Sequence, residues 1–373
     1  MSFIALDDPD NVLALLRDSV ATFGERNPGP ARLRQQRSQQ RLDRKVWTSF
    51  AESGWIGLQV PEEAGGAGLS SGAQAAVCEM FGRNLMPEPY AVLAVLVPQL
   101  LGGLPTGASR DALLAGLIAG ERIVTLGFAA HGGAPALRAR VAGQGRVLEG
   151  TLAFVEAFDD ADDLLAVAET PSGVALFRLD PRAGGLTARR RAGVDGAPLT
   201  DLTFASVTVS PADCLAEAPS GEALLGVSIA AARLALAAEL AGLAAKALEE
   251  TVEYTRTRVQ FGKAIASFQV IQHRLVDMWI QSELANAAVR NAVVQTERTP
   301  GSAVATQAVC AAKARASDAS FSICRNAIHL HGAMGITDEC NIGLYLKRAI
   351  NLGACLGNAD AMRDIFLRND THH

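Results

Sequence analysis

The spacing of apolar residues divides the chain into three parts, which are helical, β-like and helical again. From Pro9 to about Glu121 the spacing is helical. In NVLALLRDSVATF this spacing predicts one apolar face, made of Val12, Leu15, Leu16, Val20 and Phe23. The segment GLQVPEEAGGAGLS, at Gly57–Ser70, is rich in glycine and proline and is therefore expected to interrupt the helices.

From Arg122 to about Pro219 short β-like runs are separated by Gly, Asp and Pro. These runs are RIVTLGFAA, RVLEGTLAFVEAF, DLLAVAET, GVALFRLD and LTDLTFASVTVS. Their spacing predicts a small antiparallel barrel or sandwich. A basic cluster, RRRAG at Arg189–Gly193, follows a turn-like segment and is expected in a solvated loop.

From Gly221 onward the pattern predicts long, alanine-rich helices, at about 221–257, 268–297, 301–331, 338–353 and 359–369. The predicted fold class is therefore α+β. It has an all-helical domain at 1–121, a β-barrel or sandwich domain at 122–219 and a helical bundle at 220–373. A β-domain between two helical domains is an uncommon order.

Composition narrows the class of protein. The 373 residues are 49% hydrophobic and 20% charged, as in globular proteins, and the net charge of −5 without long charged blocks argues against nucleic-acid binding. The six cysteines include no CxxC pair, which predicts free thiols in a reducing compartment and no metal site. The start MSFIALDDPDNV lacks the pattern of a signal peptide, and the apolar run Ala91–Leu104 is too short to span a bilayer. We expect a soluble, cytoplasmic protein without membrane insertion.

The segment YTRTRVQFGKAIASFQVIQHRLVDM, Tyr254–Met278, carries the most chemistry. A helix is expected to end near Thr257, with Arg258, Gln260 and Phe261 in the turn before the next helix. An arginine at such a connection either holds a phosphate by charge-assisted hydrogen bonds or caps the carbonyl groups of the preceding helix. The residues alone leave both roles open.

This segment resembles the C-terminal signature of the acyl-CoA dehydrogenases, in which R-x-Q-F-G, F-Q and Q-x-x-L-x-D-M recur. The segments SGWIGLQVPEEAGGAGLS, GRNLMPEPY and AIHLHGAMGITDECNIGLYLKRA resemble further parts of that family, in the same order. The resemblance covers essentially the whole chain. It implies a middle antiparallel β-domain, a C-terminal four-helix bundle, and a dimer or tetramer that binds FAD partly across a subunit interface.

The resemblance also implies which residues contact the FAD of a neighbouring subunit. Arg258 would approach the pyrophosphate, with Gln260 and Phe261 beside it, and Phe268 and Gln269 would lie near the adenosine portion. A second stretch, Q-x-x-G-G in the family, corresponds to His329, Leu330, His331, Gly332 and Ala333, so the glutamine is His329 here and the second glycine is Ala333. Of these, His329, Gly332 and Ala333 are expected at the cofactor. His329 and His331 could instead be ordinary buried or interface histidines.

The family's catalytic base is missing from both of its usual places. It is commonly a glutamate in Tyr-Glu-Gly-Thr, and the corresponding Cys355-Leu356-Gly357-Asn358 puts Leu356 in its position. Other members carry the base beside an arginine that matches Arg233, which we expect at the substrate, and its neighbour here is Ala232. Glu239 lies two helical turns beyond Ala232 and is a candidate surrogate base. The rise of the helix, however, separates Glu239 from Ala232 by about 10 Å along the helix axis. An interhelical ion pair is the alternative role for Glu239.

The resemblance implies that the chain's own FAD site is poor. TLGFAAHGG, Thr125–Gly133, stands in place of T-E-P-x-A-G-S-D, and Phe154-Val155-Glu156 in place of Trp-Ile-Thr. Glu156 would put a negative charge near the flavin, whereas Arg258, which serves a neighbour, is retained.

The chain is therefore predicted to be the base-lacking subunit of an α2β2 acyl-CoA dehydrogenase resembling the bacterial steroid side-chain enzymes. The expected partners are an acyl-CoA substrate, a homologous acyl-CoA dehydrogenase subunit and electron-transferring flavoprotein. Two alternatives remain open, a self-sufficient homo-oligomeric dehydrogenase with an atypical base and a flavin-free scaffold that binds CoA esters. Flavin colour in the protein purified alone would favour the first.

Overall fold

The computed structural model describes residues 3–129 and 137–369, which form two compact units. The helical unit comprises Met1–Gln35, Ser71–Pro87 and Arg233–His373, and the sheet unit comprises Gln36–Ser70 and Glu88–Ala232. The predicted N-terminal domain thus contributes residues to both units. The division into three domains at 121 and 219 stays a prediction.

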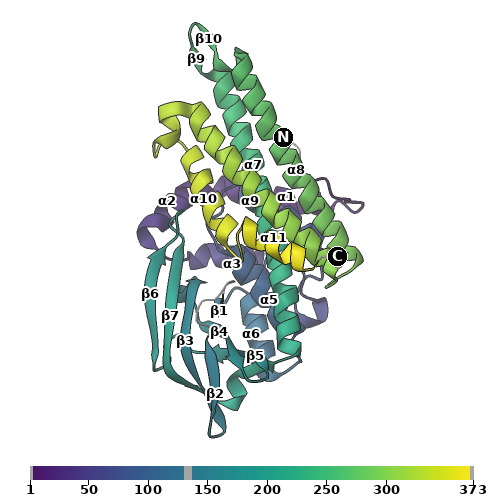
Figure 1. The fold of residues 1–373 in the computed structure, drawn as a ribbon, viewed down its shortest axis with the longest axis vertical. Coiled ribbons are helices and arrows are strands. Elements are labelled where there is room, and N and C mark those ends of the chain that lie inside the picture. Colours follow the sequence, from purple (N-terminus) through teal and green to yellow (C-terminus); the bar gives the residue numbers. More distant parts are fainter. Residues whose placement is uncertain (1–2, 130–136, 370–373) are drawn as a thin grey trace. The chain divides into compact units, whose positions relative to one another are not determined.

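Long helices that pack along one another build the helical unit (Figure 1). They are α1 (Val12–Arg26), α2 (Gly29–Gln39), α4 (Ser71–Arg83), the larger part of α7 (Ser220–Thr257), α8 (Gln269–Arg298), α9 (Ala303–His331), α10 (Ile342–Ala354) and α11 (Ala359–Arg368). Short elements connect them, namely the hairpin β9 (Val259–Gln260) and β10 (Lys263–Ala264) and the 3-10 turns η5 (Ile265–Ser267) and η6 (Gly332–Ile336). The helices expected from 221 onward are confirmed, with bounds that differ by only a few residues.

Helix α7 is long and apolar enough to cross a membrane by composition alone, but 56% of its most apolar 18-residue window is buried within the protein. Its small residues let it approach α4 closely. A Cβ atom on Gly82 of α4 would lie 1.8 Å from the Glu239 carbonyl oxygen, and one on Gly242 of α7 would lie 2.0 Å from that of Glu79. The two backbones therefore touch, and both contacts require glycine.

The predicted face of α1 is only partly right. Val20 is buried, but Leu15 is 62% exposed, and the residues that α1 buries are Leu13, Val20 and Gly24. Gly24 lies against Asn84, where a Cβ would be 2.5 Å from the side-chain oxygen. This close contact rotates the buried face of α1 away from Leu15.

The sheet unit combines short helices with one eight-stranded sheet. The helical elements are α3 (Arg44–Glu52), η1 (Glu62–Ala64), η2 (Ala91–Leu96), α5 (Val97–Gly103), α6 (Ala108–Ile118), η3 (Phe158–Asp160) and η4 (Pro211–Asp213). The strands are β1 (Val124–Gly127), β2 (Arg138–Ala142), β3 (Gly145–Glu156), β4 (Asp163–Thr170), β5 (Gly173–Leu179), β6 (Leu186–Ala192), β7 (Pro198–Val209) and β8 (Cys214–Glu217).

The strand order is β6-β7-β3-β2-β4-β5-β8, with β1 paired to β4 (Figure 1). The β1–β4 and β2–β4 pairs are parallel and the others are antiparallel, so the sheet is mixed rather than purely antiparallel as expected. The parallel pairs arise because β4 pairs with β1 and β2, which precede it in the chain, and runs in the same direction as both. Alternating apolar residues fill the core on one face, among them Leu148, Leu152, Leu164, Phe177 and Phe204.

The prediction of a loop at Arg189–Gly193 is wrong, because Arg189, Arg190 and Arg191 lie on β6, a strand at the edge of the sheet. Arg189 pairs with Asp201 and Arg190 with Thr200 in the β6–β7 register. Ion pairs tie Arg190 to Asp159 at 2.6 Å and Arg191 to Asp201. Almost every side chain of β6 is exposed, so the strand has no apolar alternation by which the sequence could reveal it.

The contact between α4 and α7 can be tested by adding one methyl group. Gly242→Ala puts a Cβ into the Glu79 carbonyl, and we expect a loss of about 1–3 kcal/mol in the free energy of unfolding. Gly226→Ala on the same helix is the matched control, since its Cβ would meet no other described atom within 4 Å. Because alanine loses less backbone entropy on folding than glycine, this variant should be about 0.5–1 kcal/mol more stable than the unmodified protein. Urea unfolding of both variants measures the difference, and equal effects would contradict the close contact.

Candidate functional site

A buried lysine meets the last carbonyl groups of α10, and a buried arginine meets a carbonyl group just beyond the end of this helix. Lys313 of α9 is fully buried, and its Nζ donates to the carbonyl oxygens of Leu352 at 2.9 Å and Gly353 at 3.0 Å. Arg233 of α7 is 7% exposed, and its Nε donates to the Leu356 carbonyl oxygen at 2.9 Å. The last carbonyl groups of a helix have no partner within the helix, and a cation is favoured there. We call these five residues the α10-end cluster.

The two cations hold a connection with unusual backbone angles. Leu356 has a φ of 55°, in the left-handed region, and Gly357 has a φ of 106°. A leucine rarely adopts such a φ, so the surrounding contacts must maintain it. The bond from Arg233 to the Leu356 carbonyl is one such contact.

Burial changes the proton affinity of both cations. The pKa of Lys313 falls to about 8, mainly because of burial; among the smaller influences, Cys355 raises it, the charge of Arg233 lowers it and Glu239 raises it. Burial also lowers the pKa of Arg233. No carboxylate of the described residues lies within ion-pair distance of the Lys313 ammonium group. Its hydrogen bonds go to carbonyl and hydroxyl oxygens, which carry no net charge.

Glu239 forms a buried ion pair with Arg348. Its Oε1 lies 2.9 Å from the guanidinium, and the two side chains are 2% and 3% exposed. The pair joins α7 to α10, which is the interhelical role considered for Glu239 from the sequence. A carboxylate bound in this way is not available to take a proton from a substrate.

A second group of residues lies where α7 ends and α8 begins (Figure 1). Phe261 and Gly262 have φ values of 54° and 77°, which form the tight turn between β9 and β10. The Phe261 ring is 92% exposed and meets Phe268 edge-on, with 6.1 Å between ring centroids. The Lys263 ammonium lies 4.3 Å from the Phe268 centroid. We call Arg258, Gln260, Phe261, Lys263, Phe268 and Gln269 the tip cluster.

Arg258 is exposed at this tip, and its guanidinium makes no hydrogen bond or ion pair to any residue in the described part of the chain. It therefore does not cap α7, which was one of the two roles left open. Gln260 and Gln269 are exposed beside it. The tip thus presents a free cation, two amides and two aromatic rings, a set that fits a ligand with phosphate and aromatic groups.

The stretch from His329 to Ala333 adjoins this tip. His329 is exposed and contacts Arg274 of α8, whereas His331 is buried and stacks on Tyr254 with 4.1 Å between ring centroids. Gly332 ends α9 with a φ of 62° and a ψ of −137°, which favours glycine. Ala333 follows in η6 without a positive φ, so its methyl group causes no backbone strain.

In the sheet unit, Phe154 is 56% exposed on a bulge of β3 with a φ of 59°. The Arg191 guanidinium lies 5.5 Å from the centre of its ring, so a cation already covers one face of the aromatic group. The Glu156 carbonyl oxygen accepts a hydrogen bond from Thr125 at 2.6 Å. Of the TLGFAAHGG segment, residues 130–133 lie outside the described residues.

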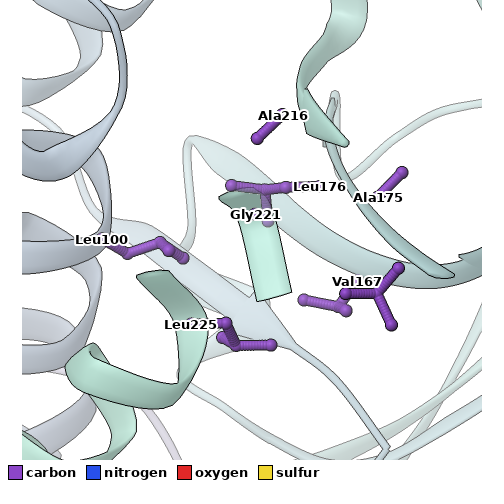
Figure 2. A pocket seen from close by; sticks show the side chains of 8 residues that line it. Leu100, Val167, Ala175, Leu176, Ala216, Gly221 and Leu225 are labelled. Atoms are coloured by element: carbon purple, nitrogen blue, oxygen red, sulfur yellow. The ribbon is translucent and has the colours of Figure 1, made fainter. Parts of the chain in front are cut away.

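Figure 2 shows a hollow in the sheet unit, among α5, β4, β5, β8 and the start of α7. Its lining consists of Leu100, Val167, Val174, Ala175, Leu176, Ala216, Gly221 and Leu225. These residues offer only aliphatic groups, so this hollow supplies no chemistry to a reaction.

Comparison with known proteins identifies the architecture. The Acyl-CoA dehydrogenase N-terminal domain matches residues 12–121, and the Acyl-CoA dehydrogenase C-terminal domain matches residues 221–369. Acyl-CoA dehydrogenase IpdE2 of Mycolicibacterium smegmatis is 30% identical over 92% of this chain and 94% of its own length. The chain belongs to the acyl-CoA dehydrogenase family.

Solved structures of acyl-CoA dehydrogenases agree with this assignment. A variant of the Tcur3481–Tcur3483 steroid ACAD has 30% identity and a TM-score of 0.85 over 96% of this chain and 97% of that one. The ChsE4–ChsE5 complex from Mycobacterium tuberculosis has 24% identity and a TM-score of 0.88 over 100% of both chains, which shows the same fold. The expected acyl-CoA dehydrogenase fold is thus confirmed, and the family consists of FAD-dependent oxidoreductases that act on acyl-CoA.

In the α10-end cluster, an arginine side chain binds the backbone of the connection that follows α10. Arg233 follows Ala232 along α7 and binds the backbone of Leu356. Neither Ala232 nor Leu356 has a side chain that can accept a proton. The cluster can hold a backbone in place, but its described residues offer no free carboxylate to a substrate.

Sequence reasoning missed four charged side chains of these sites, Lys313, Arg348, Arg274 and Lys263. Lys313 and Arg348 act on partners far along the chain, and a cation in an alanine-rich helix is usually a solvated one. The roles expected for Arg233, Arg258, Gln260, Phe261, Phe268, Gln269, His329, Gly332 and Ala333 stay predictions.

The burial of Lys313 predicts a pH dependence of stability. Since its pKa is about 8 in the folded protein and 10.5 when exposed, the folded state binds fewer protons between these pH values. The contribution of Lys313 to the free energy of unfolding should therefore rise from pH 8 to pH 10.5, by about 3 kcal/mol. Lys313→Met removes this group. Urea unfolding across this pH range should give a less positive slope for Lys313→Met than for the unmodified protein, and parallel slopes would refute the prediction.

The Glu239–Arg348 ion pair predicts that removing one of its two charges destabilises the protein more than removing both. Arg348→Met leaves a buried carboxylate without its cation and should lower the free energy of unfolding by about 3–5 kcal/mol. The double variant Glu239→Leu with Arg348→Met removes both charges and should recover most of this loss. Guanidinium unfolding of the single and double variants measures the recovery. A double variant as unstable as the sum of the single variants would contradict a direct pair.

Proposed function

We propose that this chain is the base-lacking subunit of a heteromeric acyl-CoA dehydrogenase. It takes part in the FAD-dependent α,β-dehydrogenation of a bulky acyl-CoA thioester, such as one with a steroid side chain. Its tip cluster serves the FAD of a homologous, base-carrying subunit. Electrons leave through electron-transferring flavoprotein.

The observation that carries the proposal is that neither Leu356, whose backbone Arg233 binds, nor Ala232 has a side chain that can take up a proton. Removal of the α-proton of a thioester needs a positioned base, and losing a general base costs roughly 10²–10⁴ in rate. Glu239, the candidate surrogate, is bound to Arg348 and 2% exposed. A homo-oligomer of this chain would therefore be a slow dehydrogenase, which favours a division of labour between two kinds of subunit.

The tip cluster supports the second half of the proposal. FAD, when bound, supplies the acceptor for the β-hydride of the substrate. Arg258 would pair with its pyrophosphate, and Phe261 and Phe268 offer aromatic faces. The left-handed φ of Phe261 keeps its ring exposed, which costs about 1 kcal/mol or more and is typical of a functional position.

An apolar stripe on α8 supports a subunit interface in the helical unit. Val276, Ile280 and Leu284 follow one another at intervals of four residues, Trp279 comes three residues after Val276, and each is between 42% and 52% exposed. Contiguous exposed apolar side chains commonly mark protein interfaces. The two-component names of the Tcur3481–Tcur3483 and ChsE4–ChsE5 relatives favour a homologous chain as the partner.

The test is to purify the chain alone and together with a homologous, base-carrying acyl-CoA dehydrogenase, and to count flavins per chain. We expect flavin only in the mixed assembly, with fewer flavins than chains. Full flavin content and fast turnover of an acyl-CoA by the chain alone would refute the proposal and favour a self-sufficient dehydrogenase. Absence of flavin from both preparations would favour the CoA-ester scaffold.

Arg258→Met in the mixed assembly should raise the dissociation constant of FAD about 10- to 100-fold, because a charge-assisted bond to phosphate is lost. Arg256→Met is the matched control, since Arg256 is exposed on the last turn of α7. Equilibrium titration of the apoprotein with FAD gives both constants. Equal constants for the two variants would show that Arg258 does not bind the cofactor.

A further inference from the structure

Two histidines at the end of α9, His329 and His331, use their Nδ1 atoms in opposite ways, one as a hydrogen-bond acceptor and the other as a donor. The Nδ1 atom of His331 lies 2.8 Å from the Ala327 carbonyl oxygen. Because a carbonyl oxygen only accepts, this Nδ1 must carry the hydrogen. The ring is buried against Tyr254, whose hydroxyl donates to the His331 carbonyl oxygen, so His331 has a structural role.

The exposed His329 is in the other state. Its Nδ1 lies 2.5 Å from Nη1 of Arg274. A guanidinium has five N–H donors and no acceptor, so the Nδ1 of His329 must accept. The imidazole is then neutral, its hydrogen is on Nε2, and Nε2 is a donor.

We infer that Arg274 is a positioning residue, which fixes His329 in the tautomer that donates from Nε2 to an oxygen of a bound ligand. This inference rests on the proposed function, in which the ligand is the FAD of the neighbouring subunit. The accepting atom is a carbonyl, hydroxyl or phosphate oxygen of that cofactor. Arg258 and Lys263 of the tip cluster are also donors, and together they favour an anionic ligand.

Arg274 explains how a histidine serves in this position. A glutamine, as in the Q-x-x-G-G pattern that this stretch resembles, always has amide N–H groups to donate. A neutral histidine has only one N–H, which can be on either ring nitrogen. Arg274 excludes the tautomer with hydrogen on Nδ1, and so restores a donor that glutamine would have supplied by itself.

A double-variant cycle in the mixed assembly tests this. Arg274→Met should raise the dissociation constant of FAD about 3- to 10-fold when His329 is present, because its donor is no longer fixed. In the His329→Gln background the same change should have little effect, since an amide needs no partner to donate. Arg290→Met, at an exposed position of the same helix, is the control and should leave the constant unchanged.

Each result separates the inference from the proposed function. An equal loss from Arg274→Met in both backgrounds, or no loss in either, would overturn the inference while a flavin-containing assembly still supports the proposed function. A mixed assembly without flavin would overturn both. Nitrogen chemical shifts of labelled histidine in the chain alone report the His329 tautomer independently, and hydrogen on Nδ1 would overturn the inference directly.

Discussion

A helix that ends inside a protein must find donors for its last carbonyl groups, and at the end of α10 the buried Lys313 supplies them, while Arg233 binds the Leu356 carbonyl just beyond. Lys313 reaches this end from α9 and Arg233 from α7, so one connection depends on three helices. The backbone of Leu356 is thereby held firmly although its side chain is inert. The connection after α10 is therefore held in a left-handed conformation by contacts to its backbone, although the Leu356 side chain cannot take part in proton transfer.

The charges inside the helical unit have separate tasks. Glu239 and Arg348 neutralise each other between α7 and α10, while Lys313 is satisfied by neutral oxygens alone. At the tip, by contrast, Arg258 is exposed without a partner among the described residues, and the ring of Phe261 is exposed on a turn with a left-handed φ. Interior cations thus maintain the fold, whereas Arg258 is left exposed at the surface.

Much of the fold could be predicted from the sequence, because the C-terminal helices carry a regular apolar spacing between clear glycine and proline breaks. The tip cluster could also be located, since its residues lie together within a short segment. The α10-end cluster could not. Lys313 binds carbonyl groups 39 and 40 residues away, and backbone atoms have no signature in the sequence. The Glu239–Arg348 pair spans 109 residues, so only folding brings its partners together. Strand β6 could not be predicted from the sequence, because nearly all of its side chains are exposed and apolar and polar residues do not alternate along it.

The arginines of β6 have a consequence beyond their ion pairs. The rim of a sheet offers unpaired backbone groups to any other extended polypeptide, and this is a common origin of fibrous aggregates. Neighbouring guanidinium groups on that rim repel an identical rim and remain hydrated. The charged rim thus disfavours the joining of two copies of this chain edge to edge.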